Sequence, residues 1–255
     1  MRHPNDCAIG VMAKAPQAGR SKTRLCPPLT PGQAAALSAG FLRDITANVA
    51  AAAIQQPMTG YIAYAPAGSE SLFDGHLEPG TSLLLANGTT VTDPGVDGFG
   101  RCLLHAIRGM LALGHGSAVV LNSDSPTLPT AFLAKSAEVL GAPGDRIVLG
   151  PADDGGYYLL GMKTAHTRLF ADVAWSTDSV AATTRIRAAE LGLEVVELPM
   201  WYDVDDPASL SRLIAEVPDA DVADDGAAAP YHAAQTFQVL ERLRLRKSTL
   251  DMAAE

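Results

Sequence analysis

Four cations lie close together near the start of the chain, and their types are those that bind phosphate. Lys14, Arg20, Lys22 and Arg24 fall within eleven positions, and no acidic residue occurs from residue 7 to residue 43. Arginine offers a two-pronged fork to phosphate oxygens, whereas lysine acts as a point charge. The chain as a whole is acidic, with a formal net charge of −9 at pH 7. A local excess of positive charge in an acidic protein predicts a binding site for a small anion.

This cationic loop matches neither of two common phosphate-binding motifs. The chain contains no GxxxxGK[ST] of a Walker A loop, and no GxGxxG follows an expected strand, so a Rossmann dinucleotide site is unsupported. Lys14, Lys22 and Arg24 are the expected phosphate donors, and Gly19 permits a tight backbone path. The alternative interpretation is a solvated basic loop. In that case the long stretch without acidic residues would be accidental.

Asp124 stands shortly after a segment, 117–121, that is apolar beyond its first residue. A carboxylate at the end of such a strand can bind Mg²⁺ or Mn²⁺, hard cations that take oxygen ligands from the protein and from the phosphates of a substrate. Alternatively, Asp124 caps the following helix, although Ser123 and Ser125 are able to do so in its place. We therefore expect Asp124 to be a metal ligand.

Two later segments add further aspartates. Asp153 and Asp154 are adjacent in a glycine-rich turn, so we expect one side chain to face the site and the other to point away. The same Asp-Asp-Gly-Gly sequence is also ordinary turn chemistry. Asp203 and Asp205 are candidate metal ligands, whereas Asp206 precedes a proline and is expected to cap a helix. Trp175 offers a ring that stacks on a base or a sugar or, equally, packs in the core.

Composition argues against several classes of protein. With 19 basic residues against 28 acidic ones, a broad surface for nucleic acid is not expected. Six histidines without ligand spacing or an HExxH motif argue against a zinc enzyme, and three cysteines without a CxxC pattern predict reduced thiols. The sequence has no run of 18 uncharged apolar residues and no signal peptide, so we expect a cytoplasmic protein without a membrane span.

The elements that must position these residues alternate between strands and helices. The expected strands are 8–13, 59–65, 82–86, 117–121, 147–149, 157–162 and 194–198, and the expected helices are 31–53, 98–113, 129–140, 179–191 and 207–217. The gap between 147–149 and 157–162 is too short for a crossover helix, so one of these strands must run antiparallel to the rest or lie outside the main sheet. This order predicts an α/β protein with a single open, mixed, mainly parallel sheet and helices on both faces. The cationic loop and the aspartates then share the rim at the carboxyl ends of the strands.

The chain of 255 residues is expected to form one catalytic domain with a short appendage. Residues 1–217 make up that domain, 218–230 form an acidic linker rich in alanine and proline, and 231–255 form a C-terminal helical arm. Phe237 and Leu240 lie on one side of a short basic amphipathic helix in this arm. We expect the helix to pack against the domain or to form a homodimer contact, with a role at a membrane surface or in regulation as the alternative.

Five segments in this order resemble a known family: AKAPQAGRSKTRL, SDSPTLP, GPADDGGYYLLGM, WST and YDVDDP. They are similar to a bacterial family of predicted glycosyltransferases with a glycosyltransferase A-type, nucleotide-diphospho-sugar transferase-like fold, often associated with arsenosugar biosynthesis. The resemblance spans roughly residues 8–215. More distantly, the chain is similar to nucleotidyltransferases such as the molybdenum cofactor and phospholactate guanylyltransferases.

The resemblance implies a role for each matching residue. The nucleotide-phosphate loop would comprise Lys14, Gly19, Lys22, Thr23 and Arg24. Asp124 would take the metal position of the fold, with Asp203 or Asp205 as a possible second ligand, and the sugar or acceptor side would include Asp154, Gly155, Gly156, Gly98 and Trp175. Two features depart from the family pattern. The segment 97–101 lacks the usual glutamate, and Ser-Asp-Ser replaces the DxD of many sugar transferases.

The favoured hypothesis is therefore transfer of a sugar from a nucleoside-diphosphate sugar to an acceptor with a divalent metal, Mg²⁺ or Mn²⁺. Asp124 and the cationic loop would stabilise the departing diphosphate, and Asp154 would act as the base for the acceptor hydroxyl. The first alternative is nucleotidyl transfer, in which a nucleoside triphosphate joins a phosphorylated small molecule and pyrophosphate is released. The second is a nucleotide-binding module without catalytic activity.

Overall fold

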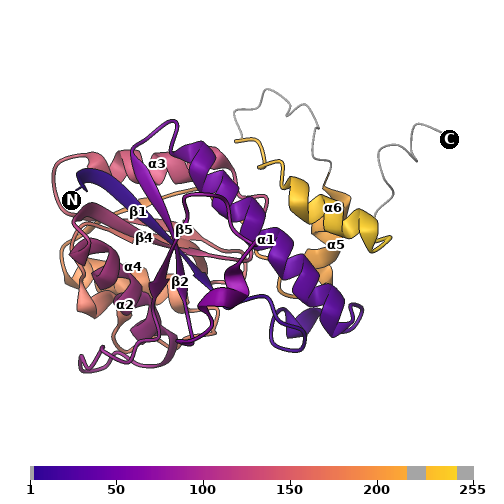
Figure 1. The fold of residues 1–255 in the computed structure, drawn as a ribbon. Coiled ribbons are helices and arrows are strands. Elements are labelled where there is room, and N and C mark those ends of the chain that lie inside the picture. Colours follow the sequence, from indigo (N-terminus) through magenta and orange to yellow (C-terminus); the bar gives the residue numbers. More distant parts are fainter. Residues whose placement is uncertain (1–2, 217–227, 246–255) are drawn as a thin grey trace.

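The computed structural model describes residues 3–216 and 228–245, and in this part of the chain seven strands form one sheet (Figure 1). The strands are β1 (His3–Ala13), β2 (Met58–Tyr64), β3 (Ser82–Leu85), β4 (His115–Asn122), β5 (Arg146–Pro151), β6 (Tyr157–Met162) and β7 (Glu194–Glu197). Their order across the sheet is β3-β2-β1-β4-β6-β5-β7. Only β6 runs antiparallel to its neighbours, β4 and β5. The predicted open, mixed, mainly parallel sheet is confirmed.

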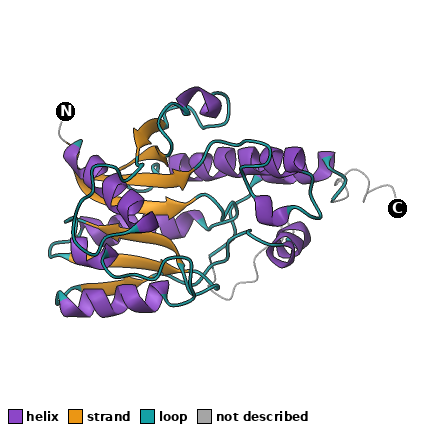
Figure 2. Ribbon diagram, turned by 90° about the horizontal axis from the view of Figure 1, so that it is seen from below, coloured by secondary structure: helices purple, strands orange, loops and turns teal. Residues whose placement is uncertain are grey.

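Helices cover both faces of this sheet, as Figure 2 shows. The helices are α1 (Pro31–Ala52), α2 (Gly98–Ala112), α3 (Thr130–Gly141), α4 (Val180–Glu190), α5 (Pro207–Ala215) and α6 (Ala234–Arg242), with short 3-10 turns η1 (Thr23–Leu25), η2 (Glu70–Phe73) and η3 (Thr167–Phe170). Helices α1 and α3 bury apolar side chains against one face of the sheet, and α2 and α4 do so against the other. Within the described residues, no helix is long and apolar enough to cross a membrane.

Local sequence signals explain where several elements begin. Thr30 accepts a hydrogen bond from the Gln33 backbone, and the Gln33 side chain accepts one from the Thr30 backbone, so the predicted start of α1 is a capping box. Strand β1 begins at His3, whereas the sequence predicted a start at residue 8. The prediction missed the first residues of the strand because several of them are polar and do not continue the apolar run. The three 3-10 turns were not predicted, since a segment of three or four residues has no hydrophobic period to detect.

The C-terminal helix packs against α1 within the same chain. Phe237 and Leu240, the residues that suggested a packing arm or a dimer contact, are buried in a cluster with Phe41 of α1. The Asp44 carboxylate is buried at the start of α6, where it accepts hydrogen bonds from the backbone N–H groups of Gln235 (3.0 Å) and Thr236 (2.6 Å). Asp44 thus caps α6 from another helix. Most of the predicted linker, residues 218–227, lies outside the described residues.

Replacing Asp44 with alanine should lower the free energy of unfolding by about 2 kcal/mol, because two N–H groups at the start of α6, one of them buried, lose their acceptor. Urea denaturation measures the change. The matched control is Glu138→Gln on α3, which removes an exposed pair with Lys135 and should change stability by less than about 0.5 kcal/mol. Equal stability of Asp44→Ala and the parent protein would show that α6 does not need this cap.

Candidate active site

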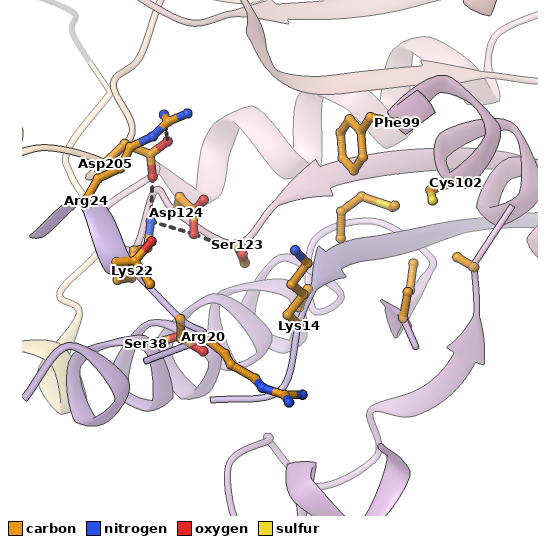
Figure 3. A pocket seen from close by; sticks show the side chains of 17 residues that line it. Lys14, Arg20, Lys22, Arg24, Ser38, Phe99, Cys102, Ser123, Asp124 and Asp205 are labelled. Carbon is orange, nitrogen blue, oxygen red and sulfur yellow. Dashed lines mark hydrogen bonds and ion pairs between the residues drawn. The ribbon is translucent and has the colours of Figure 1, made fainter. Parts of the chain in front are cut away.

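A cavity of about 390 Å³ opens at the carboxyl ends of β1, β2 and β4 (Figure 3). Its polar end is lined by Lys14, Arg20, Ser21, Lys22, Thr23, Arg24, Ser38, Ser123, Asp124 and Asp205. Its less polar end is lined by Met12, Ala13, Ala63, Ala65, Ala86, Phe99 and Cys102. The cationic loop and two of the predicted aspartates therefore meet at the rim where the sequence placed them.

Lys22 lies at the centre of the polar end. Its Nζ is 2.7 Å from Oδ1 of Asp124 and 2.8 Å from Oδ1 of Asp205, and it donates a hydrogen bond of 2.8 Å to the Val204 carbonyl oxygen. The Lys22 side chain is only 7% exposed, so the ammonium is surrounded by three oxygen atoms away from bulk water. The expected convergence of a loop cation with Asp124 is present.

The backbone holds this arrangement from three separate segments. Lys22 adopts a left-handed conformation, with φ of +50°, immediately before η1, whose Leu25 is fully buried. On the opposite side, the Val204 backbone N–H donates to the Asp124 carbonyl oxygen at 2.8 Å. The Ser125 hydroxyl donates to a backbone carbonyl just before Asp203, that of Tyr202, at 2.8 Å. The loops that carry Asp124 and Asp205 are thus joined by hydrogen bonds that do not involve Lys22.

Charge keeps Lys22 protonated despite its burial. Burial alone lowers the pKa of the ammonium, but the adjacent carboxylates of Asp124 and Asp205 outweigh this effect and raise the pKa above its ordinary value. Arg24 adds a weaker contact, with Nη1 3.7 Å from Oδ2 of Asp205, and its side chain is 75% exposed. Lys14 and Arg20 line the same cavity, so further positive charge faces the space beside the ion-pair cluster.

Asp203 lies in an excess of negative charge. Burial, together with the negative charges of Asp205, Asp154 and Asp124, raises its pKa to about 7 against the opposing effect of Lys22. Asp203 is not among the residues that line the cavity. Its ionisation is nevertheless coupled to the charges of the three other aspartates and of Lys22.

The adjacent aspartates of the glycine-rich turn have different partners. Asp153 pairs with Arg212 of α5, with 3.2 Å between Oδ2 and Nη1. Asp154 is exposed, and its Oδ1 accepts a hydrogen bond of 2.8 Å from the Gly156 backbone. Asp154 does not line the cavity, but it is the member of the pair whose charge acts on Asp203.

Glycines in the predicted sugar side serve close packing. Gly155 has φ of +88°, and a Cβ there would lie 2.1 Å from the Asp178 carbonyl oxygen, so only glycine fits. At Gly100, a Cβ would lie 2.8 Å from the Trp175 ring. Gly19, Gly98, Gly155, Gly156 and Trp175 are not among the residues that line the cavity.

The aromatic side chain at the cavity is Phe99, which sequence reasoning did not select. Phe99 is 50% exposed and meets Trp175 edge to face, with ring centroids 6.1 Å apart. The indole N–H of Trp175 is buried and has no hydrogen-bond partner among the described residues. Trp175 thus supports the start of α2, and Phe99 presents the ring surface to the cavity. The alanines at the ends of β2 and β3, which line the cavity, are the sequence feature that could have indicated an open space here.

Comparison with known proteins places this fold among the nucleotide-diphospho-sugar transferases. A crystallised protein from Desulfovibrio desulfuricans G20, provisionally assigned as a nucleotide-diphospho-sugar transferase, is 25% identical, covers 96% of each chain and gives a TM-score of 0.74. CMP:2-keto-3-deoxy-manno-octonic acid synthetase, solved with CTP, shares the fold with a TM-score of 0.51, at 10% identity over 82% of this chain and 96% of its own. The resemblance drawn from the five sequence segments is confirmed.

The family itself follows from the sequence match. Residues 48–177, just over half of the chain, match the family model described as an uncharacterized protein conserved in bacteria (DUF2064). The chain belongs to this family. Among proteins with curated descriptions, none matches the chain.

Asp203 gives the site a testable pH dependence. Its pKa is about 7 in the folded protein, against about 3.9 in an unfolded chain, so the folded state loses stability as the pH rises from about 4 to about 7. Asp203→Asn removes this loss. With EDTA present, the variant should be about 1–2 kcal/mol more stable than the parent at pH 8, after allowance for solvent screening, and equally stable at pH 4.

Urea denaturation at the two pH values measures the effect, and Asp74→Asn, at an exposed position, is the control that should show no difference between them. A constant stability difference at both pH values would mean that Asp203 ionises normally.

Proposed function

We propose that this protein transfers a glycosyl group from a nucleoside-diphosphate sugar to an acceptor, with a divalent metal bound at the carboxyl ends of the strands. The observation that carries the proposal is the convergence of Lys22, Asp124 and Asp205 at the polar end of the cavity. The relative from Desulfovibrio desulfuricans supports a nucleotide-using transferase, because its likeness extends over nearly the whole of both chains. The identity of the released product decides whether the transferred group is a sugar.

The oxygen atoms around Lys22 fit a hard divalent cation. Two carboxylates and the Val204 carbonyl oxygen already surround one positive group at 2.7–2.8 Å. Within residues 3–216 and 228–245, no three His, Cys, Asp or Glu side chains are placed together to hold a metal. Mg²⁺ is often bound by one or two carboxylates together with the phosphates of a substrate, and Asp124 and Asp205 suit that mode of binding. Asp203 remains the candidate for a further ligand.

The chain's own cations would bind the diphosphate. Lys14, Lys22 and Arg24 line the cavity beside Asp124, so their charges would stabilise the negative charge that develops on a departing nucleoside diphosphate. A bound metal would add Lewis-acid stabilisation of the same charge. Thr23 and Gly19 belong to the same loop and would shape its backbone around the phosphates.

The less polar end of the cavity suits a flat ring. Alanines at the ends of β2 and β3 leave space, and the exposed face of Phe99 offers a stacking surface for a base or a sugar. The acceptor would approach from the side of Asp154, where Gly155 and Gly156 complete the turn. Trp175, which lies beside Gly98, would support Phe99 on the acceptor side.

Nucleotide sugars and nucleoside triphosphates, each tested with Mn²⁺ or Mg²⁺, distinguish the proposed function from its alternatives. Release of a nucleoside diphosphate from a nucleotide sugar supports glycosyl transfer, and release of pyrophosphate from a triphosphate supports nucleotidyl transfer. Thermal stabilisation by nucleotides without any metal-dependent turnover supports a binding module.

Asp124→Asn should lower the metal-dependent rate by about 10²–10³, the typical result of removing one group that stabilises a developing charge. The rate is measured at saturating metal and nucleotide sugar. A rate within threefold of the parent would remove Asp124 from the site.

Asp154→Asn should lower the rate of transfer to the acceptor by about 10²–10⁴ while leaving Mn²⁺ binding unchanged, if Asp154 is the base. Asp153→Asn is the matched control, because Asp153 is the adjacent carboxylate paired with Arg212, and it should retain the parent rate. Full activity of Asp154→Asn would assign the base to another group.

A further inference from the structure

The ammonium of Lys22 stands among the oxygen atoms that a metal would need. Its side chain is 7% exposed, and its Nζ lies 2.7 Å from Asp124 and 2.8 Å from Asp205, with the Val204 carbonyl as a third oxygen at 2.8 Å. A metal on the same oxygens would lie within a few ångströms of the ammonium, where the repulsion between two positive charges in a partly desolvated site is large. Metal and lysine therefore compete for one position.

We propose that Lys22 is an exchangeable cation of the ligand-free site: it neutralises Asp124 and Asp205 until a metal-bound diphosphate arrives, and its ammonium then moves onto the diphosphate. This inference rests on the proposed function and adds a rule for binding. Metal alone binds weakly, because it must displace a buried charge that has no new partner. Metal and diphosphate together bind cooperatively, because the metal displaces the Lys22 ammonium from the carboxylates and the diphosphate supplies a new partner for that ammonium.

The other cations of the loop are placed differently. Arg24 is 75% exposed and only 3.7 Å from Asp205, so it does not block the oxygens. Lys14 and Arg20 line the cavity but form no ion pair within the described part of the chain, and Figure 3 shows Arg20 pointing away from the cluster. Lys22 alone among these four residues is held by two carboxylates.

Charge and space both favour the exchange. One ammonium leaves the pair Asp124 and Asp205 with a net negative charge, so a divalent cation neutralises the pair better than lysine does. The Lys22 side chain borders the cavity and has several rotatable bonds, so its ammonium can move toward a ligand there while the backbone of the loop stays in place.

Binding of Mn²⁺ to the nucleotide-free protein, measured by electron paramagnetic resonance, tests the proposal without turnover. Lys22→Met should bind Mn²⁺ at least about tenfold more tightly than the parent, because the competing charge is gone. Lys14→Met is the matched control, which removes a cation from the same cavity but not from the oxygens, and should change Mn²⁺ affinity by less than about threefold. Pyrophosphate should tighten Mn²⁺ binding to the parent, and much less so to Lys22→Met.

Equal or weaker Mn²⁺ binding by Lys22→Met, or no binding by either protein, would overturn the proposal. If the variant does not fold, the parent protein supplies a second measurement: the ¹⁵N signal of the Lys22 ammonium should shift when Mg²⁺ and pyrophosphate are added together. A signal that stays unchanged at saturation contradicts the exchange.

The outcomes also separate this inference from the proposed function. Tighter Mn²⁺ binding by Lys22→Met in a protein that uses no nucleotide sugar supports the exchange and removes glycosyl transfer. Turnover of nucleotide sugars by the parent, with no change in Mn²⁺ affinity in Lys22→Met, supports glycosyl transfer and overturns the exchange.

Discussion

A buried ammonium group requires negative partners, and in this protein that requirement joins three distant segments. Lys22 comes from the loop after β1, Asp124 from the end of β4, and Asp205 from the loop between β7 and α5. Removing either carboxylate would leave buried charge poorly compensated, which costs several kcal/mol in typical proteins. The same ion pairs therefore fix the shape and the charge of the site. The other cations of the loop, Lys14, Arg20 and Arg24, give the cavity beside these ion pairs its positive charge.

The sheet makes this meeting possible. Strands β1 and β4 are adjacent and parallel, so the segments that follow them emerge side by side at one rim. Strand β7 lies at the edge of the sheet, and its following loop returns toward β4 because Val204 bonds to the Asp124 backbone. A separate apolar cluster, formed by α1, α5, α6 and the η1 turn, supports the loop that carries Lys22 from the side away from the sheet. The C-terminal helix is thereby connected to the site through packing.

Much of this arrangement was predictable from the sequence, and the part that was not depends on contacts between distant side chains. The capping box at Thr30 is local, and the antiparallel strand follows from a gap too short for a helix. The acid-free stretch predicted a cationic loop, and the aspartate after β4 predicted its partner. The sequence left both Asp203 and Asp205 as candidate ligands, because only the folded loop brings Asp205 against Lys22. The position of Phe99 beside the cavity likewise depends on tertiary packing, in which Trp175 meets its ring edge to face.

The oxygens around Lys22 are proposed to form a site for a metal and a diphosphate. Anomalous diffraction at the manganese edge, from crystals soaked with Mn²⁺ and a nucleoside diphosphate, locates the metal without any assay of activity. We expect a manganese peak between the Asp124 and Asp205 carboxylates, with the Lys22 ammonium moved onto the diphosphate. A peak elsewhere, with Lys22 still held between the two carboxylates, would show that these oxygens do not form the metal site.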